Sequence, residues 1–288
     1  MDVVNVLCQI AQPGDCILDI GAHRGDVSGA LAKSTQGTAP IYAFECHPQH
    51  YFHLAKRAGD CPSIHPFCKA MSDRIGHSTF YFGLEPQVDQ ASTLMPELAN
   101  KDRLGEGFTS LRVETDTVDQ FCQRQDLKPT FMKIDVEGAE SLVFSGAKMI
   151  VEKHRPALVF EHGYSQRAPV AWYFNWLSQL GYQFFAIDLF VFAGPVVTGW
   201  KDVAPALLPI VPDDLQALHQ ETSCMMNVAA VQPERMNAYG LSLSEHSLAE
   251  FFRIMPTLKF HDPEPKLNGW RATVRQNLGR VKRALIRH

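Results

Sequence analysis

The 288-residue sequence lacks several features that point to particular environments or ligands. Its seven cysteines are scattered and none forms a Cys-x-x-Cys pair, so they favour reduced thiols over disulfides or a zinc site. No apolar run approaches the roughly 20 residues that a membrane span needs. The N-terminus also lacks the positively charged start of a signal peptide. These absences together predict a cytoplasmic protein.

The sequence as a whole also lacks a large excess of positive or negative charge. The formal net charge of -4 and the isoelectric point of about 6.3 give no general attraction to nucleic acids or to anionic membranes. No Asn-Pro-Pro-Tyr-type motif of base-flipping enzymes occurs, which argues further against a nucleic-acid partner. The hydrophobic content of 45% is sufficient for a sizeable core.

Apolar runs alternate with helical patterns, which is typical of βαβ units. We therefore predict an α/β protein with a doubly wound, mainly parallel sheet. Two β segments, 77–83 and 108–114, flank a polar loop at 87–106, and this insertion after the third strand is expected to shape a substrate pocket. The other expected strands are 16–20, 41–45, 63–70, 130–136, 157–162, 183–190 and 225–231, and the expected helices are 26–33, 48–58, 117–124, 139–147 and 168–180.

The first expected strand and the turn after it are the most informative part of the sequence. The strand contains Asp19 near its end, and the turn from Gly21 to Gly25 leads into a helix. The next strand ends in Glu45. In doubly wound proteins the carboxyl ends of these strands hold adenosine-bearing cofactors, and glycines allow the backbone to approach the ligand. A carboxylate at position 45 can accept both ribose hydroxyls.

The composition of this turn indicates which cofactor binds. A dinucleotide fingerprint requires a glycine at position 23, where this chain has His23. S-adenosylmethionine carries a cationic amino group and a sulfonium, which suit the acidic strand end, and a carboxylate, which suits the helix start. The pattern therefore favours S-adenosylmethionine. An NAD-dependent oxidoreductase is the alternative enzyme class.

A second group of ionisable residues lies near the carboxyl ends of two later strands. Alternation along a strand places Lys133, Asp135 and Glu137 on one face, and Glu161 and His162 end the following strand. Ligands bind at this edge of open α/β sheets. Buried ionisable groups are costly unless they serve a site or pair with each other. A structural ion pair between Lys133 and Glu137 is therefore an alternative interpretation.

These segments occur in an order that resembles a known family. The chain contains Leu18-Asp-Ile-Gly-Ala-x-x-Gly25, Ala43-Phe-Glu-x-x-Pro48, Lys133-Ile-Asp-Val-Glu-Gly-Ala-Glu140 and Phe160-Glu-His162. With them the sequence resembles the FkbM family of S-adenosylmethionine-dependent methyltransferases. The resemblance implies a seven-stranded, Rossmann-like methyltransferase sheet and O-methylation of a sugar, glycan or natural-product hydroxyl. His23 departs from the family pattern, in which asparagine is common.

The resemblance also implies roles for individual residues. The glycine-containing loop would contact the methionine end of the cofactor, the end of the third strand would flank the adenine, and Asp135 would face both the methyl donor and the acceptor. The cofactor-binding residues predicted on all these grounds are Asp19, Gly21, Ala22, His23, Gly25, Glu45, Ala70, Met71 and Asp135.

Methylation of a hydroxyl calls for a base or a metal, because a neutral hydroxyl is a poor nucleophile. We predict Asp135, Glu161 and His162 as catalytic residues, with a structural role as the alternative for His162. The same three residues could share a divalent cation such as Mg²⁺. The sequence has no compact metal signature, so the prediction assigns no metal.

The end of the chain differs in composition from the rest. Residues 257–288 contain eight basic and two acidic residues, and a stripe of apolar residues recurs there at helical spacing. We therefore predict a methyltransferase domain over 1–255 and a basic linker with an amphipathic C-terminal helix over 256–288. This helix would dock on its own domain, form a homodimer, or meet an anionic lipid-linked substrate at the inner face of a membrane. A non-catalytic scaffold with a Rossmann-like fold is the remaining alternative.

Overall fold

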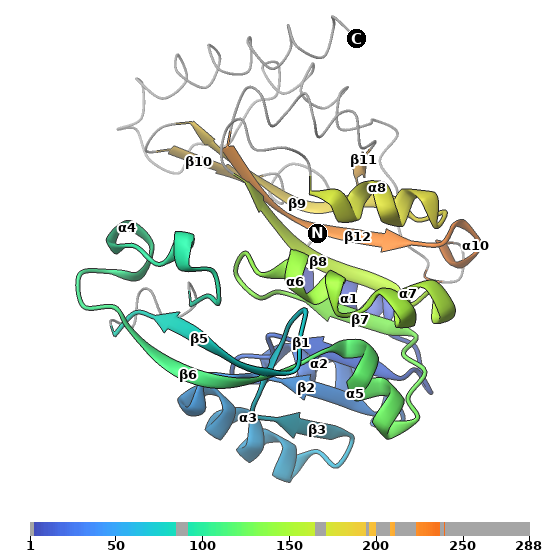
Figure 1. Cartoon of the computed structure of the whole chain (residues 1–288). Coiled ribbons are helices and arrows are strands. Elements are labelled where there is room, and N and C mark those ends of the chain that lie inside the picture. Colours follow the sequence, from blue (N-terminus) through green and yellow to red (C-terminus); the bar gives the residue numbers. More distant parts are fainter. Residues whose placement is uncertain are drawn as a thin grey trace, which may run out of the picture. The chain divides into compact units, whose positions relative to one another are not determined.

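A computed structural model gives the fold of the chain (Figure 1). The structure describes residues 3–84, 92–164, 171–193, 196–199, 208–210, 223–236 and 239. The chain divides into two units. The N-terminal unit comprises Val4–Glu161, and the C-terminal unit comprises His162–His288 together with Met1–Val3.

A parallel sheet forms the centre of the N-terminal unit. Its strands are β1 (Ile17–Ile20), β2 (Ile41–Phe44), β3 (Ile64–Phe67), β7 (Phe131–Ile134) and β8 (Ala157–Tyr164), which continues into the C-terminal unit. They lie in the order β3-β2-β1-β7-β8, and each neighbouring pair is parallel. All residues of the central strands β1 and β7 are buried, which explains their nearly continuous apolar runs.

Helices lie on both faces of this sheet. Figure 1 shows α5 and α7 in front of the strands and α2 behind them. Such an arrangement is that of a doubly wound α/β fold, as the sequence predicts. The helices of the unit are α1 (Val3–Ile10), α2 (Asp26–Ser34), α3 (Pro48–Asp60), α5 (Val118–Gln125), α6 (Glu140–Ser145) and α7 (Lys148–His154).

The strand order reverses between β1 and β7, and ligands of such sheets bind at this switch point. The Asp135 amide donates to the Ile20 carbonyl at 3.0 Å, so the loops that follow both strands begin side by side. Gly21 has a φ of 78°, and a Cβ atom there would lie 1.8 Å from the Asp135 carbonyl oxygen. Glycine is therefore required at position 21 for the two strand ends to approach this closely.

The insertion forms a second, small sheet in the order β4-β6-β5. Its strands are β4 (Ala70–Met71), β5 (Gly76–Phe82) and β6 (Thr109–Asp116), and the short helices η2 (Pro96–Leu98) and α4 (Lys101–Leu104) lie between β5 and β6. The two β segments expected in the insertion correspond to β5 and β6. The single strand expected over 63–70 is wrong, because Ala70 and Met71 leave the main sheet and pair with β6.

The helix α7, which follows α6, was not predicted. The helix predicted over 139–147 corresponds to α6, which ends before its C-cap, Gly146. A Cβ atom at this position would lie 2.1 Å from the Ser72 carbonyl oxygen. The chain after β4 therefore packs directly against the backbone at the junction of the two helices.

The C-terminal unit has antiparallel pairing around β9 (Gln183–Ala193). Its partners are β10 (Val196–Gly199), β11 (Leu208–Ile210) and β12 (Ser223–Val231), and the unit also contains α8 (Trp172–Gln179) and α10 (Pro233–Met236). With the five parallel strands, the described residues have nine strands outside the insertion, so the predicted count of seven is wrong. The expected basic helix and the boundary at 255/256 lie outside the described residues.

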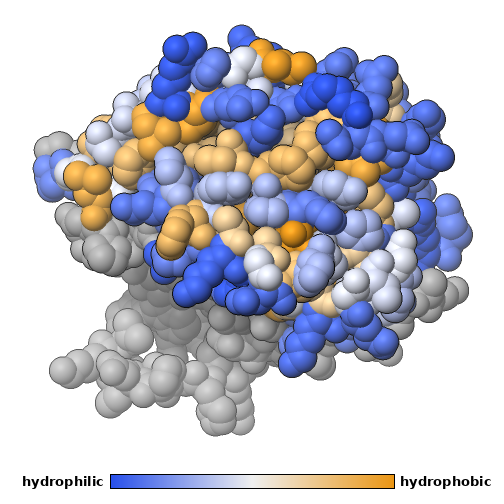
Figure 2. All heavy atoms as spheres, turned by 90° about the horizontal axis from the view of Figure 1, so that it is seen from below, coloured by the Kyte–Doolittle hydropathy of each residue, from blue (hydrophilic) through white to orange (hydrophobic). Residues whose placement is uncertain are grey.

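No helix within the described residues is both long enough and apolar enough to cross a membrane. On the face shown in Figure 2, apolar side chains lie among hydrophilic ones. The large apolar side chains that are most exposed in the described part of the chain are Phe52, Ile75, Leu84, Met149 and Trp172.

Candidate active site

A cavity of about 290 Å³ lies at the switch point of the N-terminal unit. The loops after β1, β2 and β7 provide one side of it, while β4, β5 and the segment after β5 provide the other. The insertion therefore lines the cavity, as the sequence predicts. The lining residues are Ile20, Gly21, Ala22, His23, Asp26, Val27, Phe44, Glu45, Cys46, His50, Lys69, Ala70, Met71, Phe80, Ser92, Leu94, Lys133, Asp135, Val136 and Glu137.

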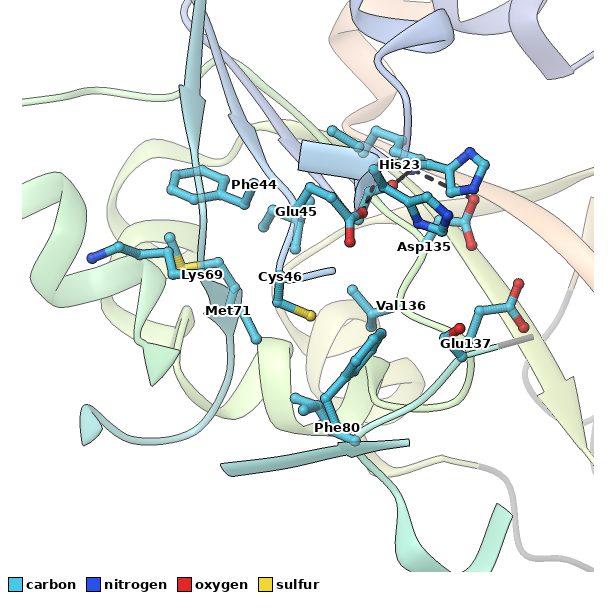
Figure 3. Close-up of a pocket in the computed structure, with 18 of the residues that line it drawn as sticks. His23, Phe44, Glu45, Cys46, Lys69, Met71, Phe80, Asp135, Val136 and Glu137 are labelled. Carbon is cyan, nitrogen blue, oxygen red and sulfur yellow. Dashed lines mark hydrogen bonds and ion pairs between the residues drawn. The ribbon is translucent and has the colours of Figure 1, made fainter. Parts of the chain in front are cut away.

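The two ends of the cavity differ in polarity. Figure 3 shows Phe44 and Met71 on one side, Asp135 and Glu137 on the other, and Glu45 between them. The apolar end is suited to a flat heteroaromatic base, because it presents aliphatic and aromatic carbon atoms. The opposite end presents carboxylates, which suit a cationic or hydroxyl-bearing group.

Glu45 ties together the loops that follow β1 and β2. Its carboxylate accepts hydrogen bonds from the amides of His23, at 2.8 Å, and His47, at 2.7 Å. Burial raises the pKa of Glu45 to about 7, against the lowering effect of the two amides. A carboxylate oxygen has two lone pairs, so each oxygen can still accept a ligand hydroxyl. Glu45 lies on the cavity wall, and its predicted binding of the ribose stays a prediction.

Asp19 lies beneath the loop rather than on the cavity wall. Its side chain is completely buried, accepts a hydrogen bond from Ser28 at 2.5 Å and lies 3.4 Å from the Lys133 ammonium. Lys133 also donates to the Gly21 carbonyl at 2.7 Å and lies 3.4 Å from Asp135. Asp19 therefore supports the loop through Lys133, and the geometry does not give it the predicted direct contact with a cofactor.

Lys133 connects the buried and the exposed parts of this network. Burial alone would lower its pKa, but the neighbouring carboxylates of Asp135 and Asp19 raise it, so the ammonium stays charged. The structure thus corrects the suggested ion pair between Lys133 and Glu137. Glu137 instead pairs with Arg103 of α4, at 2.6 Å.

Three carboxyl groups lie close together near Lys133. Ligand oxygens of Asp135, Glu137 and Glu161 lie within 4.8 Å of one another. Burial raises the pKa of Glu161 to about 9 and that of Glu137 to about 8, and Asp135 contributes to both increases by charge repulsion. The structure therefore brings together two of the three predicted catalytic residues, Asp135 and Glu161, with Glu137 as a third member.

The third predicted catalytic residue, His162, belongs to the C-terminal unit. Its side chain is buried, its Nδ1 lies 2.7 Å from the Tyr173 hydroxyl, and its ring packs edge-on against Phe174 at 4.8 Å. This environment favours the alternative interpretation of His162 as a structural histidine.

Most of the predicted cofactor residues do line the cavity. Gly21, Ala22, His23, Glu45, Ala70, Met71 and Asp135 are on its wall, whereas Asp19 and Gly25 are not. Gly25 has a φ of 81° and serves the packing of the helices, because a Cβ atom there would lie 2.7 Å from Leu54. A contact of Gly25 with the cofactor is thus not supported by the geometry.

Sequence reasoning missed several lining residues. Cys46 directly follows Glu45, which was predicted to bind the cofactor, so its place in the sequence could have indicated that it also lines the cavity. Phe80 and Leu94 come from the insertion, and nothing in the sequence specified which of its residues would face the cavity. The sequence also carries no signal for the pairing of Arg103 with Glu137.

Comparison with known families decides which enzyme class the chain represents. The sequence profile described as methyltransferase FkbM domain matches residues 19–184, which is more than half of the chain. The chain belongs to the FkbM methyltransferase family. The match includes all the cavity residues, from Ile20 to Glu137, and also Glu161 and His162.

Solved methyltransferase structures are similar to this FkbM chain at low identity. Methyltransferase FkbM from Methylobacillus flagellatus KT is 16% identical, with a TM-score of 0.43, and the match covers 75% of this chain and 44% of that one. Precorrin-6y C5,15-methyltransferase from Geobacter metallireducens is 10% identical, with a TM-score of 0.41 and coverages of 80% and 87%.

Aeropyrum pernix fibrillarin, in complex with S-adenosyl-L-methionine, is 12% identical, with a TM-score of 0.39 and coverages of 76% and 67%. The chain thus spans less than half the length of the FkbM structure that it matches. No curated protein sequence matches the chain significantly.

Proposed function

We propose that this FkbM chain is an S-adenosylmethionine-dependent O-methyltransferase that acts on a hydroxyl of a sugar, glycan or natural product. The observation that carries the proposal is the order of groups along the cavity. An apolar end, the buried Glu45 carboxylate and the Asp135 carboxylate follow one another. This order corresponds to the adenine, ribose and sulfonium of the cofactor.

The residues present fit such a cofactor. Ala70, Met71 and Phe80 would contact the adenine, and Glu45 would accept the ribose hydroxyls. The methionine portion would lie along the backbone at Gly21 and Ala22, whose amides both donate to the Phe44 carbonyl, at 3.0 and 2.9 Å. The cavity volume of about 290 Å³ is close to the lower end of the range for small-molecule sites, about 300–1,000 Å³.

The chemistry then divides between the cofactor and the chain. S-adenosylmethionine supplies an electrophilic methyl group when it is bound. Asp135 would accept the proton that the acceptor hydroxyl loses as its oxygen takes the methyl group. Its side chain is 41% exposed and lies 3.4 Å from the Lys133 ammonium, which supports this role. Proton transfer of this kind contributes typically about 10²–10⁴-fold to a rate.

Two alternatives have weaker support from the site. The side chain of His23 lines the cavity where a dinucleotide fold has a glycine that makes room for pyrophosphate, which disfavours NAD. A non-catalytic scaffold would not need an open cavity. The cavity in this chain is lined by the intact carboxylates of Glu45 and Asp135.

The test has a binding step and a transfer step. Calorimetry should show that S-adenosylhomocysteine binds and that NAD does not. S-adenosylmethionine with a labelled methyl group is then incubated with neutral glycosides, aminoglycosides, uronic acids, nucleotide sugars and phenolic natural products. Label should appear as a base-stable methyl ether, and Asp135→Asn should reduce its formation by about 100-fold, while binding of S-adenosylhomocysteine, which lacks the sulfonium charge, is retained.

Binding of NAD instead of S-adenosylhomocysteine would overturn the proposal as a whole. Label in an ester or an N-methyl group would retain the methyltransferase but reject the O-methyl assignment to a hydroxyl.

A further inference from the structure

Glu137 lies on the cavity wall in a backbone conformation that needs support. It has a φ of 54°, and Gly138 follows with a φ of 97°, so two consecutive residues are left-handed. For a residue with a side chain this conformation is unfavourable and persists only where the surroundings impose it. The loop after β7 is therefore held in place by specific contacts.

The first of these contacts come from α6. The Glu140 carboxylate accepts hydrogen bonds from the amides of Val136 and Gly138, both at 3.2 Å. Glu140 is buried, so these bonds fix the backbone on either side of Glu137 from within the N-terminal unit.

Further contacts come from the insertion. The Arg103 guanidinium donates to the Glu137 carboxylate at 2.6 Å and to the Glu137 carbonyl at 3.2 Å. Leu98 packs so closely on Gly138 that a Cβ atom there would lie 2.4 Å from its Cδ1 atom. The same segment of the insertion thus fixes both the side chain of Glu137 and the turn that follows it.

Acidic side chains outnumber basic side chains around Glu137. The cations that face it are Arg103, which binds it directly, and Lys133, which is engaged by Asp19 and Asp135. The acidic groups that raise its pKa are Asp135 of the same loop and Glu140 of α6, and Glu161 of β8 lies in the same cluster. Within the described residues this end of the cavity therefore offers carboxyl groups to a ligand, while its cations are already paired. A cationic ligand would lower the raised pKa values of Glu137 and Glu161 and favour their carboxylate form.

We propose that Glu137 is a specificity-determining residue at the acceptor end and that Arg103 is its positioning residue. The acceptor end would accordingly take an uncharged or cationic hydroxyl compound in preference to an anionic one. This inference rests on the proposed function, because it requires that the methyl group is presented to the carboxylates of this end.

The inference can be tested without knowledge of the acceptor. Sinefungin is a cofactor analogue that carries an ammonium group where S-adenosylmethionine carries its methyl sulfonium, whereas S-adenosylhomocysteine is uncharged at that atom. The ratio of their dissociation constants therefore measures how strongly the site favours a cation at the point of transfer. We expect the full chain to bind sinefungin at least about tenfold more tightly.

Glu137→Gln should reduce this ratio at least about threefold while the affinity for S-adenosylhomocysteine stays within about twofold. The matched control is Glu97→Gln, which removes an exposed carboxylate from the insertion and should leave the ratio unchanged. An unchanged ratio in Glu137→Gln would overturn the inference. Failure of the wild-type chain to bind S-adenosylhomocysteine would overturn the proposed function instead.

Arg103 provides a second, independent arm. If Arg103 positions Glu137, Arg103→Met should lower the ratio as Glu137→Gln does, and Arg103→Lys should restore part of it. If Arg103 acts only as a charge that repels the ligand, its removal should raise the ratio. A rise or no change in Arg103→Met would therefore refute the positioning role. Transfer of label to uronic acids or nucleotide sugars alone would refute the predicted preference for an uncharged or cationic acceptor.

Discussion

The replacement of Glu45 by glutamine tests the centre of the proposed site with the smallest change in shape. Glutamine keeps one oxygen, but its amide nitrogen is a donor and cannot accept from a backbone amide. The present carboxylate accepts from the amides of both His23 and His47. Glu45→Gln therefore leaves one of these two amides without its acceptor and also removes the charge that would strengthen bonds to the ribose.

The size of the effect follows from these bonds. A hydrogen bond to a charged group contributes about 1.5–3 kcal/mol, and an unsatisfied buried donor costs about 1–3 kcal/mol. The unsatisfied donor affects the free protein and the complex alike, so it lowers the melting temperature. The bonds to the ribose affect only the complex. Loss of one of them predicts that S-adenosylhomocysteine binds at least about tenfold more weakly.

The pH dependence provides an independent measurement. The pKa of Glu45 is raised to about 7 in the free chain, and ligand hydroxyls that donate to the carboxylate favour its ionised form. Affinity should therefore be highest above pH 7 and should fall by up to about tenfold per unit as the pH decreases below it.

Calorimetry across this range should show the dependence in the wild type and a flat profile in Glu45→Gln. A flat wild-type profile, or a variant with unchanged affinity, would remove Glu45 from the cofactor site.

Further predictions concern the rest of the chain. Gly21→Ala should destabilise the protein by several kcal/mol and abolish binding of S-adenosylhomocysteine, because its Cβ atom would lie 1.8 Å from a carbonyl oxygen. The control Gly37→Ala has open space at the equivalent atom and should cost only about 1 kcal/mol in denaturant unfolding. Equal costs for the two variants would refute the role of close approach at position 21. Burial raises the pKa of Glu140 from 4.5 to about 7, so the folded state holds more protons than the unfolded state in this window and the free energy of unfolding falls as the pH rises through it, by up to about 1.4 kcal/mol per unit. Glu140→Gln should lose this part of the slope, and an unchanged slope in urea titrations from about pH 5 to about pH 8 would contradict the assignment. His162→Ala should lower the melting temperature while the affinity for S-adenosylhomocysteine is retained, since His162 is buried beside aromatic side chains; loss of affinity without loss of stability would return it to the site. Deletion of residues 257–288 should retain cofactor affinity and change either the oligomeric state or the binding to anionic vesicles at low salt; if sedimentation and vesicle flotation show neither change, the basic segment has no role in association.

The sequence predicted the central part of the fold because its signals there are local. The strands β1, β2 and β7 are short apolar runs, each followed by a turn or helix signal, so their position and type could be recognised. The error in the third strand occurred where a distant contact determines the structure. Ala70 and Met71 leave the main sheet because they pair with Thr115 and Asp116 of β6, and no local pattern reveals such a pairing.

The same distinction applies to the site. Glu45 and Asp135 were predicted because both follow recognisable strands at the edge where ligands bind. Asp19 was placed in the cavity on the same argument, but its buried side chain is engaged by Ser28 of α2 and by Lys133 of β7. The contribution of Arg103 depends on how the insertion folds back over the loop after β7, and its own sequence does not specify this.

The register of the central strands has a consequence for how related sequences can vary. Asp19 and Lys133 are direct partners across β1 and β7, and both side chains are buried. Loss of Lys133 leaves Asp19 as an uncompensated charge in the interior, whereas loss of Asp19 leaves Lys133 with Asp135 as its partner. A change at position 133 is therefore expected to be accompanied by a change at position 19 during evolution, whereas a change at position 19 alone is more readily tolerated.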